Sequence, residues 1–150
     1  MRAVVQRVLD AKVSIENKLV SQIGAGLLVF VGVEREDSKE DSLWLANKIS
    51  SLRVFSDKNG LMNNSIRDVG GEVIVVSQFT LHAKTKKGNR PSYIRAANPE
   101  QAILLYKQFK KDLSKLMRKK VYSGEFGANM KVSLTNNGPV TIIIDTKNKE

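Results

Sequence analysis

The sequence predicts an α+β fold in which a mostly antiparallel sheet curls into a barrel-like domain with two main helices. Three observations support this class. About eight apolar segments of strand length are separated by turn residues, and two longer segments repeat apolar residues at helical spacing. The length of 150 residues and the hydrophobic content of 41% suit a single domain over residues 1–150.

The first strands are expected near the N-terminus. Residues 2–9 and 12–16 are predicted to form two strands around a short turn, and residues 19–23 extend the hairpin pattern. Residues 27–33 form a near-continuous apolar run. Such a run indicates a strand that is covered on both faces.

Two helices are expected. The first covers residues 39–52, where apolar residues repeat at helical spacing after Ser38, a capping residue. Trp44 lies in this apolar stretch, so we expect it in the core or an interface, not as a base-stacking platform. The second helix begins at Asn98 and Pro99, a good N-cap and first-turn pair. One of its faces is apolar and the opposite face is lysine-rich, the apolar residues being Ala102, Leu105, Tyr106, Phe109, Leu113 and Leu116.

The remaining strands lie between and after the helices. Residues 53–55 predict a short strand before a turn, and residues 72–81 predict a buried strand that ends in hydroxyl and amide side chains. The chain closes with three short predicted strands, separated by glycine turns at Gly127 and Gly138: residues 120–125, 130–136 and 140–145.

The composition excludes several classes of site. The chain has no cysteine, so it has no disulfide, thiolate nucleophile or cysteine-bound metal. His82 is the only histidine, and the acidic residues are scattered, so we expect no metal, no cofactor and no carboxylate pair. The apolar runs are far shorter than the ~20 residues of a membrane helix, and charges interrupt the N-terminal segment. We therefore expect a cytoplasmic protein without a membrane partner.

The net charge of +10 favours a polyanionic partner without identifying it. The basic residues gather in a loop over residues 82–98 that holds no acidic residue. We interpret this loop as a contact for nucleic-acid phosphates, although a solvated loop would have the same composition. Its candidate RNA-binding residues are Lys84, Lys86, Lys87, Arg90 and Arg95.

Two short segments are candidates for chemistry. In "VSQFTL", residues 76–81, polar side chains stand at a strand end, where free backbone amides could bind an oxyanion. A strand whose polar residues merely face solvent would look the same. In "TNNGPVTIII", residues 135–144, Gly138 and Pro139 precede an apolar run. Pro139 could simply mark the start of a strand, because proline has no amide hydrogen for the ladder.

These two segments carry a resemblance. "VSQFTL" at 76–81 and "NNGPVT" at 136–141 are similar to the two signature motifs of the D-aminoacyl-tRNA deacylases. The segments "MRAVVQRV", "DVGGEVIVVSQFTL", "KKGNRPSY" and "GANMKVSLTNNGPVT" extend the resemblance over nearly the whole chain. His82 stands where tyrosine is frequent in the family and Lys84 where aspartate is common, which leaves details of the pocket rim open.

The resemblance implies a homodimer that hydrolyses, without a metal, the ester between a D-amino acid and the 3'-terminal adenosine of tRNA. Glycyl-tRNA mischarged on tRNA-Ala would also be a substrate. It further implies that Gly138 and Pro139 form a cis peptide reaching into the partner's pocket as a backbone wall. An L side chain would collide with such a wall. Met130, Val140 and Thr141 join Gly138 and Pro139 as expected substrate-binding residues.

The expected catalytic residues are Ser77, Gln78, Phe79 and Thr80. The backbone amides of Phe79 and Thr80 are candidate oxyanion donors. Because no base is evident beside Thr80, we expect water to attack, assisted by the ribose 2'-hydroxyl. Two alternatives stay open: a Thr80-nucleophile esterase or amidase, and a noncatalytic RNA-binding module.

Overall fold

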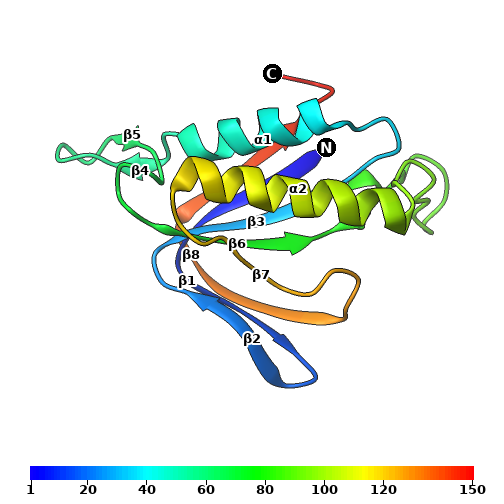
Figure 1. The fold of residues 1–150 in the computed structure, drawn as a ribbon, viewed down its shortest axis with the longest axis horizontal. Helices are drawn as coiled ribbons and strands as arrows, with labels where there is room; N and C mark the ends of the chain where they lie inside the picture. The colour runs from blue at the N-terminus through cyan, green and yellow to red at the C-terminus, as the bar shows by residue number, and fades with distance from the viewer.

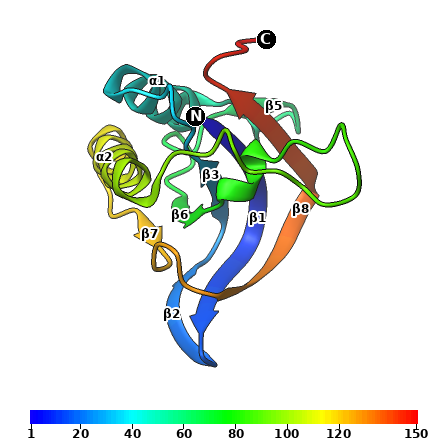
Figure 2. The ribbon, with the colours of Figure 1, turned by 90° about the vertical axis from the view of Figure 1, so that its right-hand side faces the viewer.

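The computed structural model describes residues 1–150 and contains one six-stranded sheet that curls into a nearly closed, barrel-like shape (Figures 1 and 2). The order of strands along the sheet is β2-β1-β3-β6-β7, and β8 pairs with the other edge of β1. The strands are β1 (Arg2–Ile15), β2 (Lys18–Ile23), β3 (Gly26–Gly32), β6 (Glu72–Ser77), β7 (Tyr122–Ser123) and β8 (Met130–Asp145). A separate two-stranded sheet consists of β4 (Phe55–Ser56) and β5 (Met62–Asn64).

The pairing is antiparallel around β1 and parallel at the other edge. Strand β1 pairs antiparallel with β2, β3 and β8, whereas β3 pairs parallel with β6 and β6 with β7. The α+β class with two main helices is confirmed.

Both helices begin with the caps that the sequence predicted. Helix α1 (Lys39–Ser51) starts with a capping box between Ser38 and Asp41. Helix α2 (Pro99–Met117) starts at Asn98, whose side chain accepts a hydrogen bond from the amide of Gln101 at 2.9 Å. Figure 2 shows both helices side by side on one face of the sheet, away from β8.

The core has two parts that lie on opposite faces of β3. Toward the helices, Leu27 and Val29 belong to a large buried cluster with Ile49 and Phe109. Toward the inside of the curled sheet, Leu28 belongs to a smaller cluster with other strand residues, listed here in chain order: Val8, Ala11, Val13, Ile23, Ile74 and Val76. The expectation that residues 27–33 are covered on both faces is confirmed.

Two breaks that were predicted between neighbouring strands are absent from the structure. Residues 2–9 and 12–15 lie in the single strand β1, and Glu16 belongs to the turn after it. Residues 130–136 and 140–145 lie in the single strand β8. The two long strands pair along most of their length, from Arg2 with Asp145 to Ile15 with Met130. Local turn residues were therefore overridden by the hydrogen bonds that each strand offers to the other.

The predicted strand over residues 72–81 is too long. Strand β6 ends at Ser77, and residues 79–82 form a short 3₁₀ turn, η1 (Phe79–His82). The amide of Gln78 still donates to the carbonyl of Val31 at 2.8 Å, after which Leu81 donates back to Gln78 at 3.2 Å. Two other predicted strands also differ in extent. In place of residues 53–55, β4 covers only Phe55–Ser56, and in place of residues 120–125, β7 covers only Tyr122–Ser123.

Candidate active site

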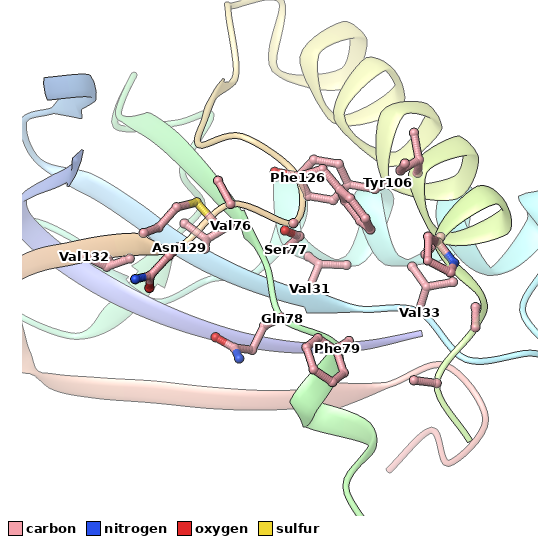
Figure 3. A pocket seen from close by; sticks show the side chains of 18 residues that line it. Val31, Val33, Val76, Ser77, Gln78, Phe79, Tyr106, Phe126, Asn129 and Val132 are labelled. Carbon is pink, nitrogen blue, oxygen red and sulfur yellow. The ribbon is translucent and has the colours of Figure 1, made fainter. Parts of the chain in front are cut away.

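A cavity of about 720 Å³ opens beside the end of β6, under the N-terminal half of α2. Most of its lining is apolar, with Val31 and Val76 from the sheet and Tyr106 from α2. Figure 3 shows Phe126 next to Tyr106 on one side of the cavity and Asn129 with Val132 on another. The shape and lining are those of a small-molecule pocket with few polar groups.

Polar groups enter the cavity mainly where β6 ends. Ser77, Gln78 and Phe79 line it in succession (Figure 3). Thr80 does not line it, but its hydroxyl accepts a hydrogen bond from the side-chain amide of Gln78. The structure thus brings the four residues of the first segment together at one end of the cavity.

The turn that follows β6 begins at this end of the cavity. Phe79 and Thr80 open η1, and the first N–H groups of a helical turn have no partner within the turn. The turn packs closely on β3, because a Cβ on Gly32 would lie 2.8 Å from the carbonyl oxygen of Gln78 and 3.0 Å from His82 Cδ2. Glycine at position 32 therefore permits this close approach.

No base stands beside Thr80. The nearest candidate in the chain, His82, is buried, and neither of its ring nitrogens has a hydrogen-bond partner. Burial lowers the pKa of His82 below its usual value, so the ring is neutral at pH 7. The hydroxyl of Thr80 is consequently not activated by a neighbouring imidazole.

Two aromatic residues border and close the cavity. Phe79 is 57% exposed, and its ring packs edge-on against that of Tyr93, with the ring centroids 5.0 Å apart. Tyr106 is held by a hydrogen bond from its hydroxyl to the carbonyl of Val75 at 2.9 Å, and burial raises its pKa. Tyr106 therefore acts as a neutral, fixed wall.

Met130 is the one expected substrate-binding residue that lines the cavity of its own chain. It packs against Gly124, where any Cβ would collide with the Met130 sulfur. Gly138, Pro139, Val140 and Thr141 do not line this cavity. Within one chain, the two signature segments are therefore not brought to a common site.

The second segment forms a bulge in β8. Gln6 pairs with Thr141 and Val8 with Asn136, so that residues 137–140 stand opposite Arg7 alone. The Gly138–Pro139 bond is cis, as the resemblance implied, and both residues are exposed. A bulge of this kind re-aims the strand locally and interrupts the ladder.

Side chains hold the bulge from both sides. Arg7 donates from Nε to the carbonyl of Asn137 at 3.0 Å and from its terminal nitrogen to the carbonyl of Val54. Asn136 accepts from the Val140 amide at 3.0 Å and donates to the Thr141 hydroxyl at 3.2 Å. Sequence reasoning missed Arg7 as a supporting residue, although a charged residue within an apolar strand is a signal that could have found it.

The residues of the basic loop differ in their surroundings. Lys84, Lys86, Lys87 and Arg90 are exposed, and a β-bridge between Lys84 and Ser92 ties the loop's two arms together. The guanidinium of Arg95, in contrast, contacts the buried carboxylate of Glu34 at 2.8 Å. Four of the five predicted cations are thus free to meet an anion, whereas Arg95 fastens the end of the loop.

No three histidine, cysteine, aspartate or glutamate side chains lie together in a way that could hold a metal ion. Neither helix combines the length and the apolar composition that crossing a bilayer requires.

Comparison with known proteins identifies the family. The family described as D-Tyr-tRNA(Tyr) deacylase matches residues 4–145. The D-aminoacyl-tRNA deacylases of Bacteroides thetaiotaomicron and Flavobacterium psychrophilum are each 59% identical to this chain over 150 residues, which covers all of both chains. The D-aminoacyl-tRNA deacylase of Akkermansia muciniphila is 57% identical over the same full length.

Solved structures agree. A structure titled "c-Myc DNA Unwinding Element Binding Protein" has a TM-score of 0.92 and 40% identity, and the match covers 97% of this chain and 98% of that one. A "probable eukaryotic D-amino acid tRNA deacylase" has a TM-score of 0.81 over 95% of this chain and 97% of that one; at 16% identity it shows the fold alone. The resemblance drawn from the two motifs is confirmed, and the chain belongs to the D-Tyr-tRNA(Tyr) deacylase family.

Proposed function

We propose that this chain is a cytoplasmic hydrolase, a single domain over residues 1–150, that cleaves the ester bond of D-aminoacyl-tRNA. The products are a free D-amino acid and tRNA, and glycyl groups mischarged on tRNA-Ala are removed in the same way. The observation that carries the proposal is the position of residues 77–79 at the polar end of an otherwise apolar cavity, in a chain that matches the family over residues 4–145.

The chemistry assigned to the site is attack by water. The oxygen of water adds to the ester carbonyl carbon, the bond from that carbon to the ribose oxygen breaks, and a proton passes to the departing oxygen. The amides of Phe79 and Thr80 stabilise the negative charge on the carbonyl oxygen. The ribose 2'-hydroxyl assists the water, because the neutral, buried His82 and the unactivated Thr80 offer no protein base.

Selectivity for handedness is assigned to the bulge of a second subunit. Gly138 and Pro139 are exposed and do not line the cavity of their own chain, while Arg7 and Asn136 bind the backbone on either side of them. In a homodimer these residues would close the partner's cavity with main-chain atoms, and Val140 and Thr141 would flank them. An L side chain would collide there, whereas a D side chain or glycine would fit.

The same strand offers surface for such a dimer. Ile143, two residues beyond Thr141, is 75% exposed. Apolar surface of this kind is commonly covered at subunit interfaces. A two-fold axis would place each bulge against the other subunit's cavity, since an isologous interface repeats every contact twice.

Incubation with D-tyrosyl-tRNA and L-tyrosyl-tRNA in parallel, each with and without a chelator, tests the reaction. We expect release of D-tyrosine only, unaffected by chelator. Binding of tRNA without turnover would instead establish a noncatalytic RNA-binding module, for which the net charge of +10 would suffice. Equal hydrolysis of both esters with no dependence on salt would favour a Thr80-dependent esterase.

Subunit mixing tests the shared site. Gly138→Trp should block the cavity of the partner, and Gln78→Ala should damage the cavity of its own chain. In a randomly mixed population about half of the dimers are hybrid and each hybrid has one intact site, so about a quarter of wild-type activity should return. No recovery in co-expressed mixtures would contradict a site made by two chains.

A further inference from the structure

Helix α2 carries an exposed row of lysines on its outer surface. The helix is fastened to the sheet by its buried residues, among them Leu105, Phe109 and Leu113. Lys107, Lys111 and Lys115 are exposed and follow one another at intervals of four residues, which places them on one side of the helix. Figure 2 shows α2 at the edge of the molecule, on the opposite side from β8.

The three lysines, called the α2 row below, are not neutralised within the protein. None of the ion pairs of the structure involves a residue of α2. Asp112, the nearest acidic residue in sequence, instead accepts hydrogen bonds from Gln108 at 2.8 Å and from Ser42 of α1 at 3.5 Å. The positive charge of the row therefore faces solvent.

Helix stability does not explain the whole row. Cations in the last turn of a helix interact favourably with its dipole, and Lys115 occupies that position. Lys107 and Lys111 lie further back, where the dipole effect has faded. Lys110, on a neighbouring side of the helix, differs from the row because it donates to the Ser123 hydroxyl at 2.8 Å.

The row begins one residue after the part of α2 that lines the cavity. Ile103 and Tyr106 of α2 line the cavity, and Lys107 follows Tyr106 directly in the chain. At 1.5 Å of rise per residue, the row extends about 12 Å from Lys107 to Lys115. A nucleic-acid strand carries a phosphate about every 3.4 Å along its axis, so several phosphates fall within reach of flexible lysine side chains.

We propose that the α2 row binds phosphates of the double-stranded acceptor stem while the 3' end of the RNA occupies the cavity. The inference rests on the proposed function, since that function places the 3'-terminal adenosine at the cavity. The row is a second basic surface, distinct from the basic loop over residues 82–98, which precedes α2 in the chain (Figure 1). Phosphate contacts do not depend on base sequence, so the row favours stems of any sequence equally.

Two triple variants of equal charge test the row. The row variant is Lys107→Gln, Lys111→Gln, Lys115→Gln. The control variant is Lys39→Gln, Lys48→Gln, Lys58→Gln, which removes exposed lysines from α1 and from the β4–β5 connection. Each variant loses three positive charges, so that +10 − 3 leaves a net charge of +7 in both.

Each protein is assayed with D-tyrosyl-tRNA and with D-tyrosyl-adenosine, which has the same ester and no stem. We expect the row variant to lose at least about tenfold in kcat/KM on the tRNA substrate and nothing on the adenosine ester, with the control variant close to wild type. The slope of log affinity for uncharged tRNA against log salt concentration should become shallower by about 1 per lysine removed.

Equal losses in the row and control variants would overturn the inference, and so would a matching loss on D-tyrosyl-adenosine. If the wild-type protein hydrolysed neither ester, the proposed function would fail. The salt slopes measured with uncharged tRNA would still decide whether the α2 row binds the stem, so the two failures can be told apart.

Discussion

At the scale of one residue, Thr80 belongs to the segment at the end of β6 but lacks the base that a threonine nucleophile requires. Its hydroxyl lies beside the cavity but is used as an acceptor by the Gln78 side chain. A threonine hydroxyl needs a base to become a strong nucleophile at neutral pH. His82, two residues further along the same turn, is buried without any hydrogen bond to its ring.

We predict that Thr80→Ala retains at least about a tenth of wild-type kcat on D-tyrosyl-tRNA, because the Thr80 side chain does not line the cavity and its hydroxyl only accepts a hydrogen bond from Gln78, a contact worth about 1 kcal/mol. Rapid acid quench followed by mass spectrometry should find no acylated protein in the wild type. Near-complete inactivation together with a trapped acyl-threonine would assign the nucleophile to Thr80.

His82 predicts a pH effect on stability. Burial lowers its pKa in the folded protein, so the unfolded chain binds a proton at a higher pH than the folded chain does. The free energy of unfolding is therefore unaffected by His82 above about pH 6.5, the usual histidine pKa. It falls as the pH drops toward the lowered pKa of the folded protein, because the unfolded chain takes up the proton first. Glu34 and Arg2 are charges that also act on this ring, with opposite signs.

Urea unfolding at pH 8 and pH 5 checks this prediction. The variant His82→Phe keeps a ring in the buried site and removes the titration, so its loss of stability between the two pH values should be smaller than that of the wild type. An identical loss in both proteins would show that other groups dominate the acid response.

At the scale of elements, the proposed site depends on two irregularities: the end of β6 at η1 and the bulge within β8. Strand β6 ends at Ser77 because the chain turns at Gln78 into η1, whose first two residues are Phe79 and Thr80. Strand β8 continues past its own bulge and resumes pairing at Thr141. At each irregularity a side-chain hydrogen bond takes the place of ladder bonds. Gln78 donates to Thr80 at the end of β6, and Asn136 accepts from the Val140 amide at the bulge.

The bulge predicts the effect of Gly138→Ala. Gly138 has φ +133°, which L residues rarely adopt, and a Cβ there would lie 2.8 Å from Val140 Cγ2 and 3.0 Å from the terminal nitrogen of Arg7. The substitution should shift the backbone and lower the ratio of D to L hydrolysis by about tenfold, as one lost packing constraint of 1–2 kcal/mol would.

Parallel rate measurements on D-tyrosyl-tRNA and L-tyrosyl-tRNA give this ratio. Thr135→Ala is a suitable control, because Thr135 is exposed on β8 just before the bulge and should leave the ratio unchanged. A ratio equal to that of the wild type in Gly138→Ala would remove the bulge from the explanation of chiral selectivity.

At the scale of the whole molecule, a buried ionic contact joins the start of β1 to the segment before α1 and to the end of β8. The α-ammonium group of Met1 pairs with Asp37, and both side chains are fully buried. The same ammonium donates to the Thr146 hydroxyl at 2.6 Å, and Asp37 accepts from the Glu34 amide at 2.7 Å. The contact joins β1, the segment before α1 and the residue after β8.

We predict that Asp37→Asn destabilises the fold by about 3–5 kcal/mol, because it leaves a buried ammonium without its counter-charge. Chemical denaturation of the variant beside Asp10→Asn measures the effect, since Asp10 is exposed on β1 and should change little. A difference below about 1 kcal/mol between the two variants would mean that the ammonium is compensated by other groups.

The sequence by itself was sufficient to identify the family, to predict both helices with their caps, and to single out the segment at the end of β6. These features depend on local periodicity and on short motifs. Only the tertiary structure decided that residues 2–15 and 130–145 are single long strands, since each strand is hydrogen-bonded to a partner more than a hundred residues away. It also decided that Arg95 is committed to Glu34, that Arg7 supports the bulge, and that Gly138 and Pro139 lie outside the cavity of their own chain. The physical reason is common to all of these: they arise from contacts between segments distant in sequence, which no local pattern encodes.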